Sequence, residues 1–193
     1  MAPTVFTDVL NDDQKAVLID TAWRSIRHGL EHGRPLRVPD ELRSGRLGEP
    51  GASFVTLHAD GRLRGCIGSL EAHRPLIDDV ADNAFSAAFR DPRFDPLEAR
   101  ELDRLSLEIS VLTKPEPLDA RSEQDLLRRI EPGRDGLILQ DGGHRGTFLP
   151  SVWESLPDPA LFVRELKRKA GLRPDHWSDR LRVWRYRTES FSG

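Results

Sequence analysis

The chain has 193 residues, a mass of 21.8 kDa and a formal net charge of −3 at pH 7, the size of one domain or of one domain with an additional lobe. Its mean hydropathy is −0.52, it has no run near the roughly 20 apolar residues that span a bilayer, and its N-terminus lacks the pattern of a signal peptide; these features argue against membrane and secreted classes and predict a cytoplasmic protein. The single cysteine, Cys66, cannot form an internal disulfide, so the composition requires no oxidising compartment.

Four helices are predicted, mainly from apolar side chains that recur at steps of three or four residues. In chain order they cover residues 12–32, 75–91, 122–130 and 158–171. Asn11 and Gln14 have the spacing of a capping box at the start of the first helix, and Pro75 is suited to the opening of the second. The Pro- and Gly-rich segment 34–51 predicts a long loop between them.

Six strands are predicted, four of them in two hairpins. In chain order they cover residues 54–59, 62–68, 105–112, 136–141, 144–149 and 181–187. Asp60-Gly61 and Gly142-Gly143 stand where the two hairpins need tight turns, and apolar and polar residues alternate along 105–112. Because helices and antiparallel hairpins are mixed without regular alternation, the predicted class is α+β.

Charge is distributed unevenly along the chain. Residues 1–159 contain 20 Lys and Arg against 28 Asp and Glu, whereas residues 160–187 contain 9 against 3. A solvated helix face followed by a strand with outward arginines explains this basic end, and contact with an anion is the alternative.

The most unusual segment is Leu63-Arg64-Gly65-Cys66-Ile67-Gly68. In a regular hairpin Arg62, Arg64 and Cys66 share one face, and Val55 lies opposite Cys66. Two guanidinium groups beside the thiol favour the thiolate, the form of a nucleophile or redox-sensitive group. The glycines allow a ligand or another chain segment to approach the backbone. The structural alternative is that Cys66 is a small buried hydrophobe and the glycines relieve crowding.

Segment 63–68 resembles the signature of the AMMECR domain family. Further stretches resemble that family in the expected order: Asp91-Pro92-Arg93-Phe94, 107–112, Thr147-Phe148-Leu149-Pro150 and Lys169-Ala170-Gly171-Leu172. They extend over nearly the whole chain, so the chain is identified as a member. Ser69, where threonine is expected, and Ser151-Val152, in place of glutamine-valine, are small departures.

The resemblance implies an α+β fold with two unequal subdomains, each an antiparallel sheet with helices, and a groove between them. Mapped onto this sequence, the larger subdomain is 1–71 with 118–193 and the smaller is about 72–117. The signature strand would face the groove. The ligand-binding candidates are Arg64, Gly65, Cys66, Ile67, Gly68 and Arg93.

The resemblance also implies partners. Stand-alone microbial members are called AmmeMemoRadiSam system protein A, which records neighbourhood with a Memo-like protein and a radical S-adenosylmethionine enzyme. A shared pathway follows, but no reaction for this chain. With one cysteine, the chain is predicted to hold no iron–sulfur cluster and no cofactor of its own.

Two further residues are low-ranking catalytic candidates. Glu108 lies on the polar side of strand 105–112, where it would pair with Arg64 or Arg93 across the groove or point outward into solvent. His144 opens a hairpin strand directly after the turn, where an imidazole can enter a groove or remain a surface turn residue. The expected register turns His58 away from Cys66.

No metal site is predicted. His28 and His32 have the i, i+4 spacing of a metal pair, but they lie near a helix C-terminus, where imidazolium is stabilised without a metal. The sequence contains no phosphate-binding glycine loop, dinucleotide fingerprint or zinc pattern.

Three functional hypotheses remain open, and the sequence does not decide whether the protein is an enzyme. The first is a groove around residues 64–68 that binds a small molecule or partner peptide. If it is catalytic, Cys66 would be the nucleophile or redox thiol, Arg64 its electrostatic support, and N–H groups near Gly65 and Gly68 the oxyanion donors. The second is a non-catalytic protein-interaction module. The third and least favoured is nucleic-acid binding by the arginines of 180–187.

Overall fold

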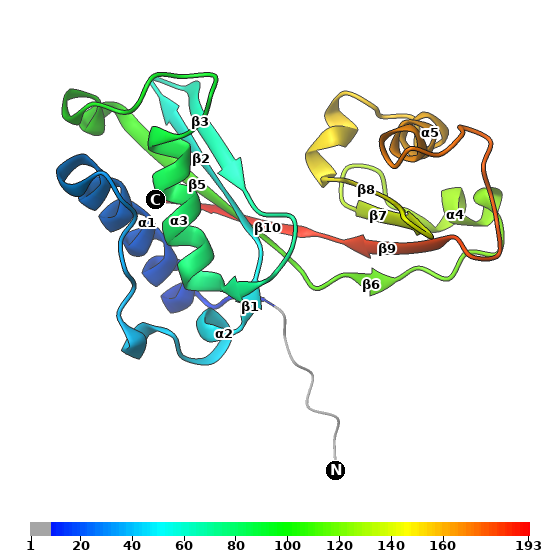
Figure 1. The fold of residues 1–193 in the computed structure, drawn as a ribbon, viewed down its shortest axis with the longest axis horizontal. Helices are drawn as coiled ribbons and strands as arrows, with labels where there is room; N and C mark the ends of the chain where they lie inside the picture. The colour runs from blue at the N-terminus through cyan, green and yellow to red at the C-terminus, as the bar shows by residue number, and fades with distance from the viewer. Residues whose placement is uncertain (1–8) are drawn as a thin grey trace, which may run out of the picture. The chain divides into compact units, whose positions relative to one another are not determined.

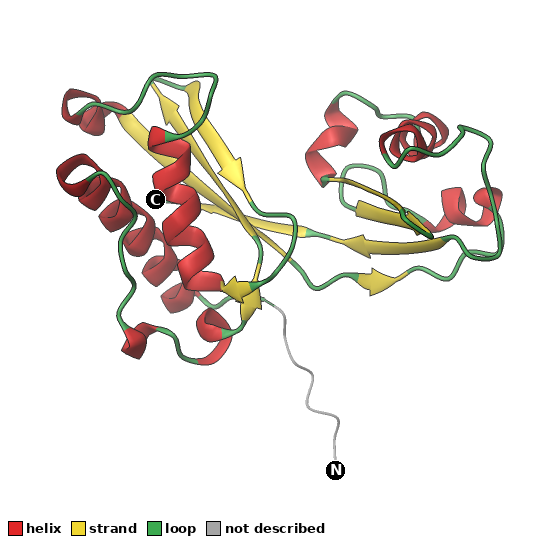
Figure 2. Ribbon diagram, in the orientation of Figure 1, coloured by secondary structure: helices red, strands yellow, loops and turns green. Residues whose placement is uncertain are grey.

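A computed structural model describes residues 9–193 (Figure 1). These residues form two compact units: the first comprises the described residues up to Leu112 together with Glu189–Gly193, and the second comprises Thr113–Thr188. The chain therefore leaves the first unit once and returns to it at its end. Helices and antiparallel sheets are both present, so the fold is α+β, as predicted (Figure 2).

This division differs from the expected subdomains, 1–71 with 118–193 and about 72–117. Helix α3 (Leu76–Phe89) and strand β5 (Leu105–Leu112), which the expected boundaries assign to the smaller subdomain, belong to the first unit. Their apolar faces share one hydrophobic core with the first helix and the first hairpin, which explains why the chain cannot be divided at residue 72.

The first unit contains a four-stranded sheet and two long helices. Its helical elements are α1 (Asp12–His32), η1 (Asp40–Leu42), α2 (Gly45–Gly48), α3 and η2 (Ala99–Arg104). Its strands are β1 (Pro50–Gly51), β2 (Ser53–Ala59), β3 (Arg62–Gly68), β4 (Arg74–Pro75), β5 and β10 (Thr188–Ser192). Strands β1 and β4 pair with each other, and the larger sheet has the order β10-β5-β2-β3, so β3 is an edge strand.

Helices α1 and α3 lie side by side against the sheet (Figure 1). The capping box predicted for α1 is present: Asn11 accepts a hydrogen bond from the Gln14 amide, and the Gln14 side chain accepts one from the Asn11 amide. Buried side chains of both helices, including Ile26 and Val80, pack with inward-facing residues of the sheet such as Leu57. This core fixes which face of each strand is buried.

The second unit is built around its own sheet and core. Its elements are β6 (Glu116–Pro117), α4 (Glu123–Arg129), β7 (Gly136–Asp141), β8 (His144–Phe148), η3 (Pro150–Glu154), α5 (Pro159–Lys169) and β9 (Arg182–Tyr186). The strand order is β6-β9-β7-β8. In the core the Trp153 ring stacks on Phe162 with centroids 3.7 Å apart, and the indole N–H donates to the Asp135 carbonyl over 2.7 Å.

Several elements depart from the sequence prediction, among them the short strands β1, β4 and β6. Segment 34–51, expected as a loop, contains η1 and α2 and buries Val38 and Leu47. Strand β10 is not predicted, because its sequence has only one large apolar residue, Phe191. The hydroxyls of Ser190 and Ser110 on β5 lie within hydrogen-bond distance, at 2.7 Å.

Among residues 9–193, no helix combines the length and apolar character needed to cross a membrane.

Candidate functional site

A β-bulge in the hairpin of β2 and β3 determines which side chains lie beside Cys66. Thr56 pairs with Cys66, but nearer the turn the register shifts by one residue, which leaves Arg64 as the extra residue on β3. The expectation that Val55 lies opposite Cys66 is therefore wrong by one position. The turn at Asp60-Gly61 forms with both residues at positive φ, as a tight hairpin turn requires; the bulge after it changes the alternation.

The bulge also reassigns the faces of the sheet. His58 alternates with Thr56 and therefore lies on the Cys66 face, contrary to the prediction. Arg62 pairs with Ala59, whose side chain points to the other face. Thus the expected row of Arg62, Arg64 and Cys66 on one face does not form.

A polar row crosses three strands on the face of the sheet that points away from the helices. The Thr56 hydroxyl lies 3.3 Å from Cys66 Sγ and donates to it, and on its other side Thr56 pairs with Glu108 of β5. All three side chains are half-buried. We call Cys66, Thr56 and Glu108 the Cys66 row.

Glu108 does not form the ion pair with Arg64 or Arg93 that the sequence suggested. Its carboxylate forms no hydrogen bond or ion pair with any residue from 9 to 193, although the side chain is half-buried. Both arginines that were candidate partners are bound to other carboxylates. The Cys66 row therefore presents a carboxylate that the described part of the chain does not use.

Arg64 is bound within the first unit. Its Nε and Nη2 donate to the Glu101 carboxylate over 2.8 and 3.1 Å, and Nη2 also donates to the Asp95 carbonyl over 3.0 Å. The hydrogen bond raises the pKa of Arg64 and lowers that of Glu101. Nη1 is enclosed, with no acceptor among the described residues. The main role of Arg64 is thus to connect β3 to η2 through its ion pair with Glu101.

Asp91 and Arg93 cover the edge of β3 at Cys66. Asp91 accepts the Cys66 amide N–H over 2.9 Å, and Arg93 donates to the Cys66 carbonyl over 3.3 Å while it pairs with Asp91 over 2.7 Å. Chiefly through the Arg93 hydrogen bond, the pKa of the buried Asp91 carboxyl lies well below its usual range. Side chains therefore satisfy backbone groups that an edge strand would otherwise expose.

The glycines of the signature are required by other parts of the chain. A Cβ on Gly65 would overlap the Ala87 carbonyl of α3, and a Cβ on Gly68 would overlap the Phe54 ring. Ile67 packs against the core. The space beside the two glycines is therefore filled by the protein's own α3 and Phe54. Of residues 64–68, only Cys66 belongs to the polar row.

The amide groups near Cys66 are also engaged. The Cys66 N–H is held by Asp91, and the Ser69 N–H donates to the Ser53 carbonyl over 2.9 Å. The predicted oxyanion donors near Gly65 and Gly68 therefore do not include these two N–H groups, since a bound N–H cannot stabilise a developing charge without exchanging partners.

A buried carboxylate, Asp79, was not singled out by the sequence. It accepts hydrogen bonds from the Ser53 amide and hydroxyl, Ser69, Arg74 and Asn83, at 2.7 to 2.9 Å. These contacts join α3 to β2 and to the segment after β3. In the sequence Asp79 reads as an ordinary acidic residue of a first helical turn, so the cluster is visible only in three dimensions.

His144 lies in the second unit, whereas Cys66 lies in the first. Its Nδ1 is 3.3 Å from the Ala170 carbonyl, and Gly171 leaves room for the ring. A contact with the end of α5 thus accounts for its position. No group of three or more His, Cys, Asp or Glu side chains suited to a metal ion occurs in residues 9–193.

Most arginines of the basic end are paired within the second unit. Arg180 lies 3.7 Å from Asp141, and Arg185 lies 3.7 Å from Glu116. Arg187 contacts Asp135 at 3.1 Å and Glu131 at 2.8 Å. Arg182 alone of these arginines donates only to backbone carbonyls in the described chain. The excess of positive charge along 180–187 is therefore largely compensated, which weakens the nucleic-acid hypothesis.

The geometry defines an α+β protein with two four-stranded antiparallel sheets and a signature strand at the edge of one of them. The chain belongs to the AMMECR1 family, whose model matches residues 19–191, as the signature and its companion stretches predicted.

Relatives of this family cover nearly the whole chain. A protein of Methanothermobacter thermautotrophicus is 41% identical over 188 residues, which is 94% of this chain and 95% of the relative. A protein of Thermofilum pendens is 39% identical over 94% of this chain and 91% of the relative. The crystal structure of an uncharacterised protein from Pyrococcus horikoshii matches with a TM-score of 0.77 and 34% identity, covering 95% of this chain and 93% of that one.

Proposed function

We propose that the first unit binds a small molecule through the Cys66 row. Glu108 carries the proposal, because a half-buried carboxylate without a partner in the described chain is suited to a ligand that donates hydrogen bonds or carries positive charge. Residues directly opposite on neighbouring strands have Cβ atoms about 5 Å apart, so the row spans about 10 Å. That length fits a compact ligand lying across the strands.

Binding fits this site better than thiol catalysis does. A thiol nucleophile needs a base or cation to activate it and donors to stabilise the developing charge. Here Arg64 is bound to Glu101, and the Cys66 N–H is bound to Asp91. Cys66 would then contact the ligand, and reaction of the thiol with it is the alternative that the experiment below tests.

A partner peptide is a weaker candidate for the same place. Peptides commonly add to a sheet as an extra strand by pairing with free backbone groups of an edge strand. Asp91 and Arg93 already occupy the outward N–H and C=O of Cys66 on β3. A peptide strand would have to displace these two side chains to pair at Cys66, or bind through side chains, as a non-catalytic interaction module.

A fragment screen by NMR tests the proposal. Fragments that carry an amine or amidine should shift the amide signals of Thr56, Cys66 and Glu108. Glu108→Gln should weaken their binding about tenfold, since a charge-assisted hydrogen bond is lost. Ser106→Ala is the matched control, because Ser106 is an exposed residue of the same strand face.

Three outcomes would count against the proposal. Fragments that bind only elsewhere, or that bind Glu108→Gln as tightly as the wild type, would overturn the assignment. A covalent adduct on Cys66 that turns over, and is lost in Cys66→Ser, would favour the enzymatic alternative.

The partners follow from the family resemblance and are part of the proposal. A Memo-like protein and a radical S-adenosylmethionine enzyme would supply or consume the ligand of the Cys66 row. Affinity purification of this protein from its own cells should recover both, and the recovery should survive Cys66→Ser if the thiol is not part of the contact.

A further inference from the structure

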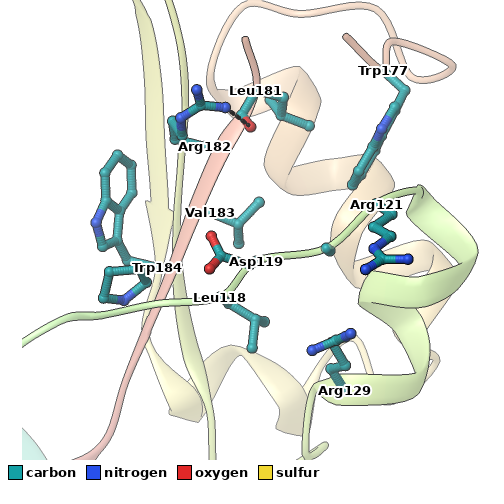
Figure 3. A pocket seen from close by; sticks show the side chains of 11 residues that line it. Leu118, Asp119, Arg121, Arg129, Trp177, Leu181, Arg182, Val183 and Trp184 are labelled. Atoms are coloured by element: carbon teal, nitrogen blue, oxygen red, sulfur yellow. Dashed lines mark hydrogen bonds between the residues drawn. The ribbon is translucent and has the colours of Figure 1, made fainter. Parts of the chain in front are cut away.

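The second unit contains a cavity of about 540 Å³ between the segment that follows β6 and the start of β9 (Figure 3). The volume lies within the range of small-molecule sites. Its polar and aromatic lining residues are Asp119, Arg121, Arg129, Trp177, Arg182 and Trp184.

The arginines of this cavity retain positive charge. Arg121 forms no side-chain hydrogen bond or ion pair with any residue in 9–193, and Arg182 donates only to backbone carbonyls. Arg129 pairs with Asp125 over 3.0 Å, but Arg128 shares the same carboxylate. Since Arg185 and Arg187 of the same strand region have carboxylate partners, the uncompensated charge is concentrated at the cavity. These guanidinium groups favour a ligand that carries an anionic group.

The cavity also offers a flat apolar surface. Trp177 lines it and is half-buried at the border of the core, whereas Trp184 alternates with the buried Val183, so its ring lies on the other face of β9, beside Ile138 (Figure 3). Aromatic side chains of this kind stack on planar rings. The ligand is therefore expected to carry a planar ring in addition to its anionic group.

Asp119 places a third condition on the ligand. Its exposed carboxylate lines the cavity and has no partner among the described residues. A ligand that is only an anion would be repelled by this group, whereas ring N–H donors would be accepted by it. A nucleobase combines a planar ring with such donors along its edge.

We propose that this cavity binds a mononucleotide. The phosphate would pair with the guanidinium groups of Arg121 and Arg129, the base would stack on an indole, and Asp119 would accept an N–H from the base edge. The limited volume of the cavity and the internal pairing of Arg180, Arg185 and Arg187 favour a single nucleotide over a nucleic-acid strand. The inference stands apart from the Cys66 row, which lies in the other unit.

Calorimetric titration of the full chain with AMP, GMP, CMP and UMP tests this inference. At least one mononucleotide should bind with a micromolar to low millimolar Kd, and adenosine or guanosine without phosphate should bind at least tenfold more weakly. Arg121→Gln should weaken mononucleotide binding about tenfold through the lost charge-assisted contact. Arg128→Gln is the matched control, because Arg128 is an exposed neighbour on α4 outside the lining.

The base contact is tested separately. Asp119→Asn exchanges a carboxylate for an amide and should change the preference among the four bases, which a merely structural role would not do. Circular dichroism should show that each variant is folded.

Four results would overturn the inference. They are the absence of binding by all four mononucleotides at 5 mM, equal binding of ribose 5-phosphate, equal weakening in Arg121→Gln and Arg128→Gln, and a single-stranded oligonucleotide that binds far more tightly than any monomer. The last two would indicate general charge attraction and a nucleic-acid surface, respectively.

Discussion

The two units use their charged residues differently. In the first unit, Arg64 is held by Glu101, and Arg93 is held by Asp91, whose carboxylate also binds backbone of β3. In the second unit, Arg121 has no carboxylate partner and Arg182 has only backbone acceptors in the described chain. Residues 113–188 contain 15 Lys and Arg against 12 Asp and Glu, whereas the rest of the chain contains 14 against 20.

The difference shows that a distinctive sequence motif need not be the part of a protein that is free to bind. In segment 63–68 the glycines accommodate other chain segments and Arg64 is tied to η2, so much of the motif serves packing. The groups left without partners among residues 9–193, Glu108 and Arg121, lie outside this segment. The predictions below test whether the charges of the first unit are structural and those of the cavity are not.

The largest effect is expected for Gly65→Val. A side chain at this position would overlap the Ala87 carbonyl on the backbone of α3, which cannot move without displacing the helix. We expect a loss of at least about 3 kcal/mol in the free energy of unfolding, or failure to fold, measured by urea denaturation. Gly143→Ala is the control, because nothing lies near a Cβ there. A stable Gly65→Val protein would contradict the packing of β3 on α3.

Asp91→Asn is expected to cost about 2 kcal/mol at pH 7, because it weakens the bonds to Arg93 and to the Cys66 amide. The pKa of Asp91 is lowered in the folded state, so its contribution is present above the unfolded value near pH 4 and is lost as the pH falls towards the folded value. The difference in stability between wild type and variant should therefore narrow below about pH 4. Urea midpoints at pH 7, 4 and 2.5 measure it, and a constant difference would contradict the pairing.

The sequence predicted the helices and strands well where a capping residue or a regular alternation of apolar residues marks them. The capping box of Asn11 and Gln14 marks the start of α1, and the alternation in 105–112 marks β5. The subdomain boundaries were wrong because they depend on which apolar faces share a core, and α3 packs with β2 across a long stretch of chain. Strand β10 was missed because its pairing with β5, rather than a pattern of its own apolar residues, holds it in the sheet.

The sequence singled out Cys66 and Glu108, but neither Thr56 nor the geometry that joins the three residues could be read from it. A single bulge at Arg64 changes the cross-strand neighbours of Cys66, bringing Thr56 beside the thiol and His58 onto its face. Nothing in a two-residue turn signals a bulge three residues later. The cavity of the second unit joins residues near 120 and 180, which no local spacing connects.

Within the second unit, Arg187→Gln should reduce stability more than Arg121→Gln does. Arg187 contacts the fully buried carboxylate of Asp135, so its loss should cost about 1 to 1.5 kcal/mol. Arg121 has no such partner among residues 9–193, and its replacement should change the free energy of unfolding by less than about 0.5 kcal/mol. Thermal unfolding of both variants checks the order. An equal loss of stability in the two variants would mean that Arg121 has a structural role like that of Arg187.

The smallest effect is expected for the chemistry of Cys66. The Thr56 hydroxyl donates to Sγ, and a hydrogen bond of this kind stabilises the thiolate that reacts with iodoacetamide. Thr56→Val keeps the shape of the side chain but removes the donor, so alkylation at pH 8 should slow by about threefold, which corresponds to about 0.6 kcal/mol. Because Cys66 is the single cysteine, the modified site is unambiguous by mass spectrometry.

Thr56→Ser retains the hydroxyl and should restore most of the alkylation rate. All rates are divided by those in denaturant, so that differences in folding do not enter the comparison. An equal rate in Thr56→Val and wild type would show that the hydroxyl does not influence the thiol. Protection of the wild type until denaturant is added would show that Cys66 is sealed. In that case the Cys66 row would contact a ligand only through Thr56 and Glu108, because a thiol that reagents cannot reach is also closed to a bound molecule.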